Sequence, residues 1–484
     1  MSFLLIAIPV MLSLLVLRRY PLFCLRNVAI VGVLFPLVVG TILFPHSLQF
    51  DALNTSNHAL FEASTKKAMT IITLGLSSFI LSILIFDTIF VRSNKNISFP
   101  TKIIKSIEQF KNISHLKSFT IFAIITILGA IPLFTVFLKL DFIPFCNISD
   151  VSDKYFRCLT DLYIPFRPFY TFGQHILTVT GFVILLYIFS IKSFKRISLF
   201  VPLYITTFLC LLLTAKRGEL LYPFAMLIGS LILLSKIKQS DIFKIALVAF
   251  IAACLVLILD PSYKRLFTYK MCSGIYSVLK IDSVSFKRSE YSENREKLSE
   301  KASYKVFSGR RWLKVLVDTF GIQVRETARL LYHFSDKGEK FYYGKTFLAG
   351  TLSFIPTTLF PFKERNYFGR VTQRLFDNNP ETSGGPNIGL IGESYVNFGY
   401  VGVIVFPFLI GILVWYVDKL YFDILQNNSL CGIITMGIFF FVVYQLVFMT
   451  FQVGSSSIQA FIVRTTIIGS IGIILFYNTN RKYR

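Results

Sequence analysis

Apolar residues form long runs that recur from one end of the chain to the other. A run of about 20 apolar residues can cross the hydrocarbon core of a bilayer as a helix. By this criterion the pattern predicts helices near 3–17, 27–44, 68–91, 118–138, 170–190, 197–214, 220–235, 244–260, 388–416, 430–452 and 457–477. The predicted fold class is therefore an all-α integral membrane protein with about eleven transmembrane helices.

One long interval separates these runs and divides the chain into three parts. The pattern predicts an N-terminal transmembrane bundle of eight helices over 1–260, a long loop over 261–387 and a C-terminal bundle of three helices over 388–484. Loops of this length are usually functional rather than connective. We therefore expect the long loop to contribute to function.

The long loop has amphipathic character of its own. In "RWLKVLVDTFGIQVRETARLLYHF" (311–334), apolar residues recur every three or four positions, and Arg311, Arg325 and Arg329 lie on another face. This spacing predicts an amphipathic helix at a membrane surface or against the bundle. The later run "LAGTLSFIPTTLFPFK" is apolar, but two prolines interrupt it and it is too short to span. We expect this run to dip into the membrane.

Composition supports the membrane assignment and excludes other classes. Hydrophobic residues make up 54% of the chain and charged residues 16%, whereas soluble domains are about 25% charged. The net charge is +24, but the basic residues alternate between loops instead of forming one stripe, so no nucleic-acid partner is expected. The seven cysteines have no metal-type spacing, so the sequence indicates neither a metal site nor a cofactor.

The distribution of Lys and Arg predicts the topology. The connections richest in these residues alternate with poorer ones, which places the N-terminus outside and the C-terminus in the cytoplasm. The long loop then lies on the outer face, and it too is rich in Lys and Arg. Two interpretations stand: the loop lies beside anionic lipid headgroups, or it binds an anionic substrate such as a phosphate.

Several basic residues are predicted near the outer face. Arg325 and Arg329 are one helical turn apart, so they form either a solvated face or a fork for pyrophosphate oxygens. Lys216 and Arg217, in "TAKRGEL", either anchor two helix ends by snorkelling or belong to the same site. Arg464 lies about two turns into the last predicted helix, and an ionisable group inside a span is usually functional.

The segment "GLIGESYVNFGYVG" places polar residues where a predicted span begins. Glu393 and Asn397 are four residues apart, with Tyr395 between them. The glycines could seat this helix closely against a neighbour, with Glu393 pairing an arginine. Alternatively, the polar start of the helix binds a sugar or orients it. Both interpretations are compatible with the sequence.

Taken in order, these motifs resemble the oligosaccharide repeat-unit polymerases, the Wzy-type O-antigen and capsule polymerases of bacteria. The resemblance rests on the basic turn at Lys216–Arg217, the long outer loop, the helix with Arg325 and Glu326, "YYGKTFLAGTLSFIPTTLFPFK" and "GLIGESYVNFGYVG". It spans roughly 211–416. Thr357 departs from it, because many members carry arginine after the Ile-Pro pair.

The resemblance implies a membrane glycosyltransferase with a GT-C-like architecture in the bacterial cytoplasmic (inner) membrane. Such enzymes transfer a growing glycan from undecaprenyl pyrophosphate to the sugar of an incoming undecaprenyl-pyrophosphate-linked repeat unit. The implied partners are this lipid-linked donor and acceptor, membrane lipids and a chain-length regulator protein. Arginines that neutralise the departing pyrophosphate would make a nucleotide or metal unnecessary.

The resulting site hypothesis assigns catalytic roles to Arg217, Arg325 and Glu393. Substrate-binding roles go to Lys216, Arg311, Arg329, His333, Lys345, Tyr395, Asn397 and Arg464. Related lipid-linked-glycan ligases have been argued to use a histidine base, so His333 is also a candidate base, although a lone histidine is often incidental.

Two other functions compete with polymerisation. An O-antigen ligase has the same architecture but uses lipid A core as acceptor, and the charge pattern cannot separate the two. A flippase or transporter of lipid-linked sugars would need no catalysis. Transporters tend to show two similar halves, and this sequence contains no internal repeat.

Overall fold

The computed structural model describes about half of the chain. The described residues are 2–19, 25–27, 29–34, 37–38, 58–91, 115–140, 167–190, 194–214, 223, 227, 322–336, 338–352, 388–426, 433–453, 457–458, 460–468 and 470. They belong to two compact units. Unit 1 comprises Met1–Lys95, Ser283–Tyr416 and Gln445–Gln459, and unit 2 comprises Asn96–Asp282, Val417–Tyr444 and Ala460–Arg484.

The described residues are mostly helical and contain no strand. Four helices are long and apolar enough to cross a membrane, over Ala63–Ile89, His115–Leu138, Tyr170–Phe189 and Gly389–Tyr421. This confirms the predicted helical, membrane-type character. The predicted helices 220–235 and 244–260 lie outside the described residues apart from Pro223 and Leu227, so the predicted number of spans stays a prediction.

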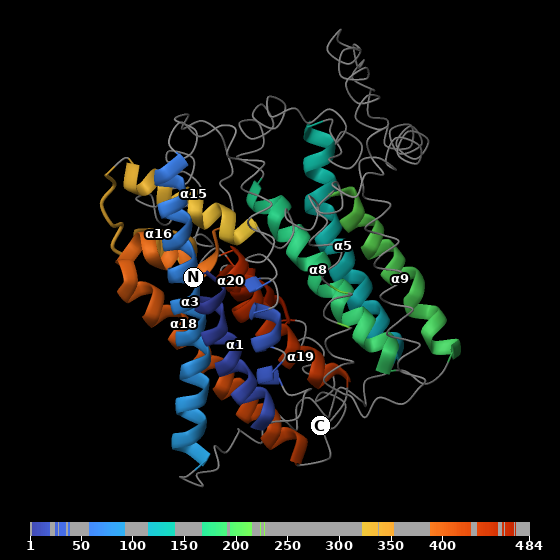
Figure 1. Ribbon diagram of the computed structural model, residues 1–484. Coiled ribbons are helices and arrows are strands. Elements are labelled where there is room, and N and C mark those ends of the chain that lie inside the picture. The colour runs from blue at the N-terminus through green and yellow to red at the C-terminus, as the bar shows by residue number, and fades with distance from the viewer. Residues whose placement is uncertain are drawn as a thin grey trace, which may run out of the picture. The chain divides into compact units, whose positions relative to one another are not determined.

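Unit 1 is built around α3 (His58–Val91). Helix α1 (Ser2–Arg19) and α15 (Ile322–Asp336) pack against α3. The short α16 (Lys345–Thr351) and the start of α18 (Gly389–Gln426) complete the part of the unit that matters for function. Figure 1 shows α15 crossing one end of α3, with α16 and the start of α18 at the same level.

Small residues bring α3 and α18 together. Gly75 lies under Ile391 and Val403, and the Ser78 hydroxyl donates a 2.7 Å hydrogen bond to the carbonyl of Ile404. Further along, Gly411 lies directly against Ser82, with no space for a side chain. Small residues let membrane helices approach closely and pack by van der Waals contact. The close approach holds the start of α18 against the middle of α3.

The other end of α3 carries a buried ion pair. Arg26 Nη1 lies 2.8 Å from Asp87 Oδ1, and both side chains are almost fully buried. A buried charge is tolerated when it is paired and hydrogen-bonded. Asp87 is near the end of α3. Lys67, near the start of α3, lies over the ring of Tyr395, which contacts Phe334 of α15. The ion pair and the α15 region therefore lie at opposite ends of α3.

Unit 2 consists of α5 (His115–Leu140), α8 (Arg167–Ser190), α9 (Phe194–Leu213) and α19 (Ile433–Val443), with a helical segment over 460–468. Helices α5 and α8 approach closely at Gly129 and Gly173. Phe122, Tyr187 and Phe200 form an aromatic cluster at their other end. The π-helical η5 (Tyr444–Met449) and α20 (Thr450–Val453) follow α19 in the sequence.

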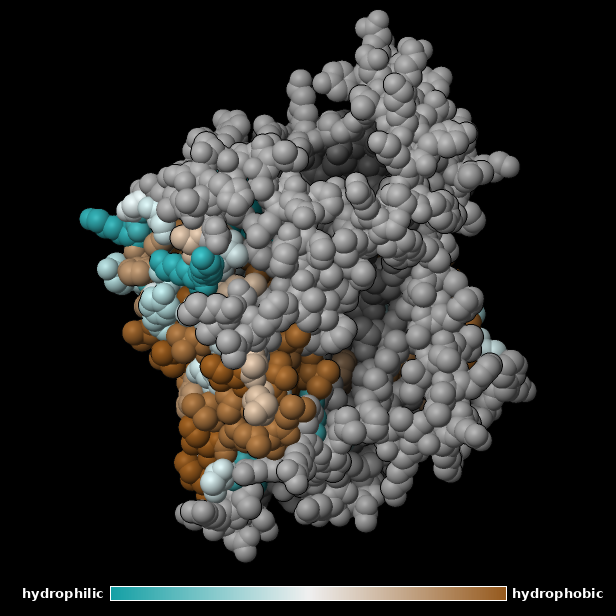
Figure 2. All heavy atoms as spheres, in the orientation of Figure 1, coloured by the Kyte–Doolittle hydropathy of each residue, from teal (hydrophilic) through white to brown (hydrophobic). Residues whose placement is uncertain are grey.

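The apolar surface of unit 1 forms a band. Exposed apolar side chains on α3 and α18 include Leu81, Ile85, Ile89, Val401, Ile404, Val405 and Leu409. Figure 2 shows this brown band below a hydrophilic area at the level of α15 and α16. Such a band is what a lipid-facing surface requires. The α15 region therefore lies at the edge of the apolar band.

Candidate functional site

Helix α15 presents one basic face. Between residues 324 and 334, only Arg325, Arg329 and His333 keep part of their surface exposed, and every other residue is buried. The three are spaced by four residues, which places them in one row along the helix. We call these three residues the basic face of α15. The sequence pattern predicted the two arginines on one face, and the structure adds His333 to the same row.

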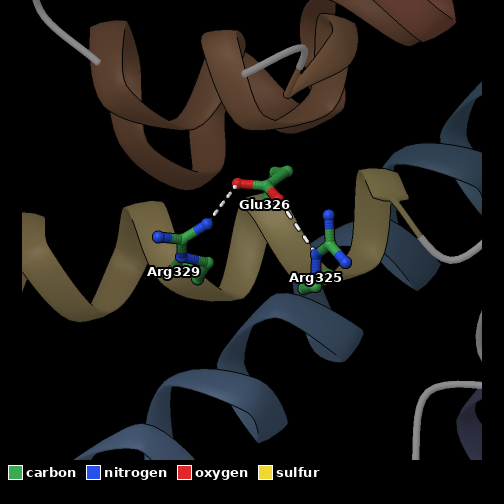
Figure 3. A network of polar contacts seen from close by, with 3 residues as sticks. All are labelled: Arg325, Glu326 and Arg329. Atoms are coloured by element: carbon green, nitrogen blue, oxygen red, sulfur yellow. Dashed lines mark hydrogen bonds and ion pairs between the residues drawn. The ribbon is translucent and has the colours of Figure 1, made fainter. Parts of the chain in front are cut away.

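Glu326 joins the two arginines. Its Oε1 lies 2.9 Å from Arg325 Nε and its Oε2 lies 3.4 Å from Arg329 Nη1. Figure 3 shows the carboxylate between the two guanidinium groups. The Glu326 side chain is 3% exposed, against 21% for Arg325 and 40% for Arg329. A buried carboxylate therefore orients two partly exposed cations, and the group keeps a net positive charge.

The rest of α15 attaches this face to α18. Leu330 and Phe334 form a buried cluster with Tyr342, Ile388 and Val396. Gly392 allows a close approach here, because a Cβ atom would lie 3.3 Å from Thr327 Oγ1 and 3.1 Å from Ile388 Cβ, and these side chains would have to shift by a few tenths of an ångström. The basic face is thus held by the "GLIGESYVN" segment that the resemblance singled out.

That segment is fully enclosed. All residues from 388 to 397 are buried, and Glu393 and Asn397 have no exposed surface. The Thr346 hydroxyl donates a 2.9 Å hydrogen bond to Glu393 Oε1, and Asn397 Nδ2 donates to Thr346 Oγ1 and to the carbonyl of Glu393. Asn397 Oδ1 accepts a 3.0 Å hydrogen bond from Gly344 N–H. We call this group the Asn397 network.

A break in α18 allows the loop before α16 to pair with it. In a regular helix the carbonyls of Val396 and Asn397 would accept from N–H groups four residues later. Gly399 has φ 62° and ψ −144°, which interrupts this pattern. The two carbonyls instead accept from Tyr342 and Tyr343, at 3.0 and 3.1 Å. The glycine of "NFG" is therefore required by the geometry, because a residue with a side chain would be strained at Gly399.

Tyr395 lies inside an aromatic cluster at this end of α18. Its ring is 5% exposed and contacts Phe341 and Tyr400, with centroids 6.1 and 5.6 Å away. The Lys67 ammonium lies 5.0 Å from the ring centroid, within cation–π range. Its burial leaves little of the Tyr395 surface for a substrate.

The other predicted site residues are placed as follows. Lys345 is exposed at the first position of α16. Arg464 is buried in unit 2, where its Nε donates a 3.2 Å hydrogen bond to Nδ1 of His175. Lys216, Arg217 and Arg311 lie outside the described residues. The structure thus brings Arg325, Arg329 and His333 together in one row. Glu393 and Asn397 lie at the start of α18, whereas Lys345 lies on α16, next in sequence to Thr346 of the Asn397 network.

Two residues of the candidate site, Glu326 and Thr346, were not singled out from the sequence. Glu326 was noted only as part of a motif, and its bridging role requires knowing that its side chain is buried between the arginines. Thr346 completes the Asn397 network, but its partners are far away in the chain, so local spacing gives no signal. Within the described residues no group of His, Cys, Asp or Glu could hold a metal ion. No family model, curated protein or solved structure matches this chain.

Proposed function

We propose that the chain polymerises lipid-linked oligosaccharide repeat units at the outer face of the bacterial cytoplasmic membrane. The growing glycan would pass from undecaprenyl pyrophosphate to a sugar hydroxyl of an incoming undecaprenyl-pyrophosphate-linked unit. The motif resemblance and the membrane-type fold support this proposal. The single observation that carries it is the basic face of α15, oriented by the buried carboxylate of Glu326.

The chemistry needs positive charge where the leaving group departs. The acceptor oxygen attacks the anomeric carbon, the bond from that carbon to the pyrophosphate oxygen breaks, and the pyrophosphate leaves with the bonding electrons. Arg325 and Arg329 supply charge-assisted hydrogen bonds to its oxygens. A guanidinium has five N–H donors, so one bond to Glu326 does not exhaust its capacity. Oriented arginines stabilise the departing charge without reorganising during the reaction.

The acceptor hydroxyl must also lose a proton. His333 is one helical turn beyond Arg329 on the same face and is partly exposed. A neutral imidazole in that row can take the proton while the arginines hold the pyrophosphate. We therefore assign the base to His333. His333→Gln should reduce the rate of glycan transfer, because the amide side chain cannot take up the proton.

Glu393 and Asn397 receive a positioning role in this proposal. Both are enclosed, and Thr346 engages the Glu393 carboxylate. Their hydrogen bonds hold the loop before α16 against α18, and α18 in turn holds α15. They therefore act on substrate through the elements they connect.

The test uses purified full-length protein in lipid nanodiscs. The substrate is the lipid-linked saccharide that accumulates in cells lacking this chain. The proposal predicts a ladder of glycan lengths on undecaprenyl pyrophosphate. Transfer only to added lipid A core would show a ligase, and transport across vesicles without new glycosidic bonds would show a flippase; either result contradicts the proposal.

A further inference from the structure

The turn between α15 and α16 holds a tyrosine in a strained backbone conformation. Tyr343 has φ 49°, the one positive φ of a non-glycine residue among the described residues. Gly344 follows with φ 84° and ψ −1°, and the N–H of Lys345 donates to the carbonyl of Tyr342 at 3.1 Å. These angles define a type I′ turn, in which Asn, Asp or Gly normally occupies the position of Tyr343. A bulky residue at this position is unfavourable.

Surrounding contacts force Tyr343 into this conformation. Its N–H donates to the carbonyl of Asn397, and the next N–H, of Gly344, donates to Asn397 Oδ1. The ring of Phe398 packs on Gly344 so closely that a Cβ atom there would lie 2.9 Å from it. Strained residues persist only where neighbours determine them in this way, and they concentrate at functional sites.

The Tyr343 ring contributes little to the packing that holds the turn. It is 73% exposed, and it makes no ring contact or side-chain hydrogen bond with the described residues. Phe341 and Phe398, on either side of the turn, behave differently, because each packs on a glycine of the opposite segment. Stability therefore does not explain a tyrosine here, since Asn or Gly would fit the turn with less strain.

We propose that the Tyr343 ring stacks on a sugar ring of the lipid-linked saccharide, with Asn397 as its positioning residue. This inference rests on the proposed function. The C–H face of a pyranose packs well on the electron-rich face of an aromatic ring, and the hydroxyl can donate to a sugar oxygen. The neighbouring residues Lys340 and Lys345 are exposed and polar, as a carbohydrate surface requires.

The position of the Tyr343 turn relative to α15 fits a saccharide whose pyrophosphate end is held by Arg325 and Arg329. Phe334 contacts Phe341 and Tyr342 at the base of the turn. Arg325 and Phe334 are about 14 Å apart along the helix axis, and Arg329 is about 8 Å from Phe334. A pyrophosphate held by Arg325 and Arg329 would leave its first sugars in reach of the turn.

Anchoring in the lipid headgroup layer is the alternative use of an exposed tyrosine. Ordinary helical positions can provide that contact without strain, and Tyr400 and Tyr416 on α18 are helical and 47% and 42% exposed. A strained placement indicates a directed contact. The geometry therefore favours the saccharide over the membrane.

The first experiment separates stability from substrate contact. Tyr343→Asn suits the turn but removes the ring, so its unfolding midpoint should equal or exceed that of the wild type. Its apparent KM for the lipid-linked saccharide should rise about 2- to 12-fold, while Tyr343→Phe stays within about twofold. Tyr416→Asn is the matched control for losing an exposed tyrosine. Wild-type kinetics for Tyr343→Asn would overturn the proposal. So would an unfolding midpoint lowered enough to account for the rise in its apparent KM.

A second experiment does not require polymerisation. Tyr343→Trp is placed in a chain whose two native tryptophans, Trp312 and Trp415, are replaced by Phe. Saccharide released by mild acid from the lipid-linked intermediate should change the emission of the introduced tryptophan, and brominated lipids should not quench it. The opposite result would show a membrane anchor. If the wild type forms no ladder, the proposed function fails, and this titration still decides whether Tyr343 contacts sugar.

Discussion

At the scale of single residues, buried polar side chains differ in how much they contribute to the stability of the fold. Asn397 uses both its carbonyl and its amide nitrogen to join the loop before α16 to α18. Ser394, three residues earlier and equally buried, has a hydroxyl without a hydrogen-bond partner among the described residues. An unsatisfied buried group is a cost, whereas a satisfied one stabilises only while its partners remain. The two positions therefore predict opposite outcomes.

Asn397→Leu should destabilise the protein. The substitution keeps a similar volume but leaves the Gly344 N–H and the Thr346 hydroxyl each short of one partner, at about 1–3 kcal/mol per unsatisfied group. Ser394→Ala is the control and should be neutral or slightly stabilising. Thermal unfolding in detergent measures both. Equal midpoints for the two variants would show that the Asn397 network does not stabilise unit 1.

At the scale of elements, the contact between α3 and α18 depends on small residues. Gly411 lies against Ser82 and the carbonyl of Phe79, so the two backbones touch. Gly181 in α8 has its nearest neighbour, Thr207 Cγ2, at 3.5 Å from an added Cβ. The first position has no space for a methyl group and the second does.

Gly411→Ala should separate α3 from α18 and destabilise unit 1 by about 1–3 kcal/mol, as overpacked cores do. Because α3 and α18 both hold α15, glycan transfer should fall as well. Gly181→Ala, the matched control, should change the stability by less than about 1 kcal/mol, because the methyl group makes only ordinary contacts and alanine favours the helix. Similar unfolding midpoints for both variants would contradict this packing account.

The sequence was sufficient to predict where some helices begin and insufficient to predict where others begin. Helix α18 begins at Gly389, close to the predicted 388, because a long apolar run marks it. Helix α3 begins at His58, well before the predicted 68, because the polar stretch "HALFEASTKK" is stabilised by α15, which no hydropathy pattern reveals. The Asn397 network and the Tyr343 turn could not be predicted, because both depend on segments about 50 residues apart.

At the scale of the whole molecule, the proposal requires α15 to face outward. The α15 region and the Arg26–Asp87 pair lie at opposite ends of α3. The Lys and Arg distribution predicts that Arg26 lies on the cytoplasmic side, which would put α15 outside. The proposed polymerisation takes place on that outer side, so the topology decides whether the basic face can meet the lipid-linked glycan.

Ser335, exposed at the end of α15, should be accessible from outside intact cells. In a chain without its seven native cysteines, Ser335→Cys should react with a membrane-impermeant maleimide before permeabilisation. Ile89→Cys, near the other end of α3, serves as the control and should not. Labelling of Ser335→Cys only after permeabilisation would reverse the topology and remove the outer site.

The central claim is that Arg325 and Arg329 hold the pyrophosphate during glycan transfer, and glycan ladders from purified variants test it most directly. Each Arg→Ala change should lower the rate by about 30- to 1,000-fold, equivalent to about 2–4 kcal/mol. Each Arg→Lys change should recover only part of the rate, because lysine keeps the charge without the planar fork. Lys117→Ala, at an exposed position on α5, is the control and should polymerise normally. Near-full ladders from Arg325→Ala and Arg329→Ala at normal protein levels would contradict the account.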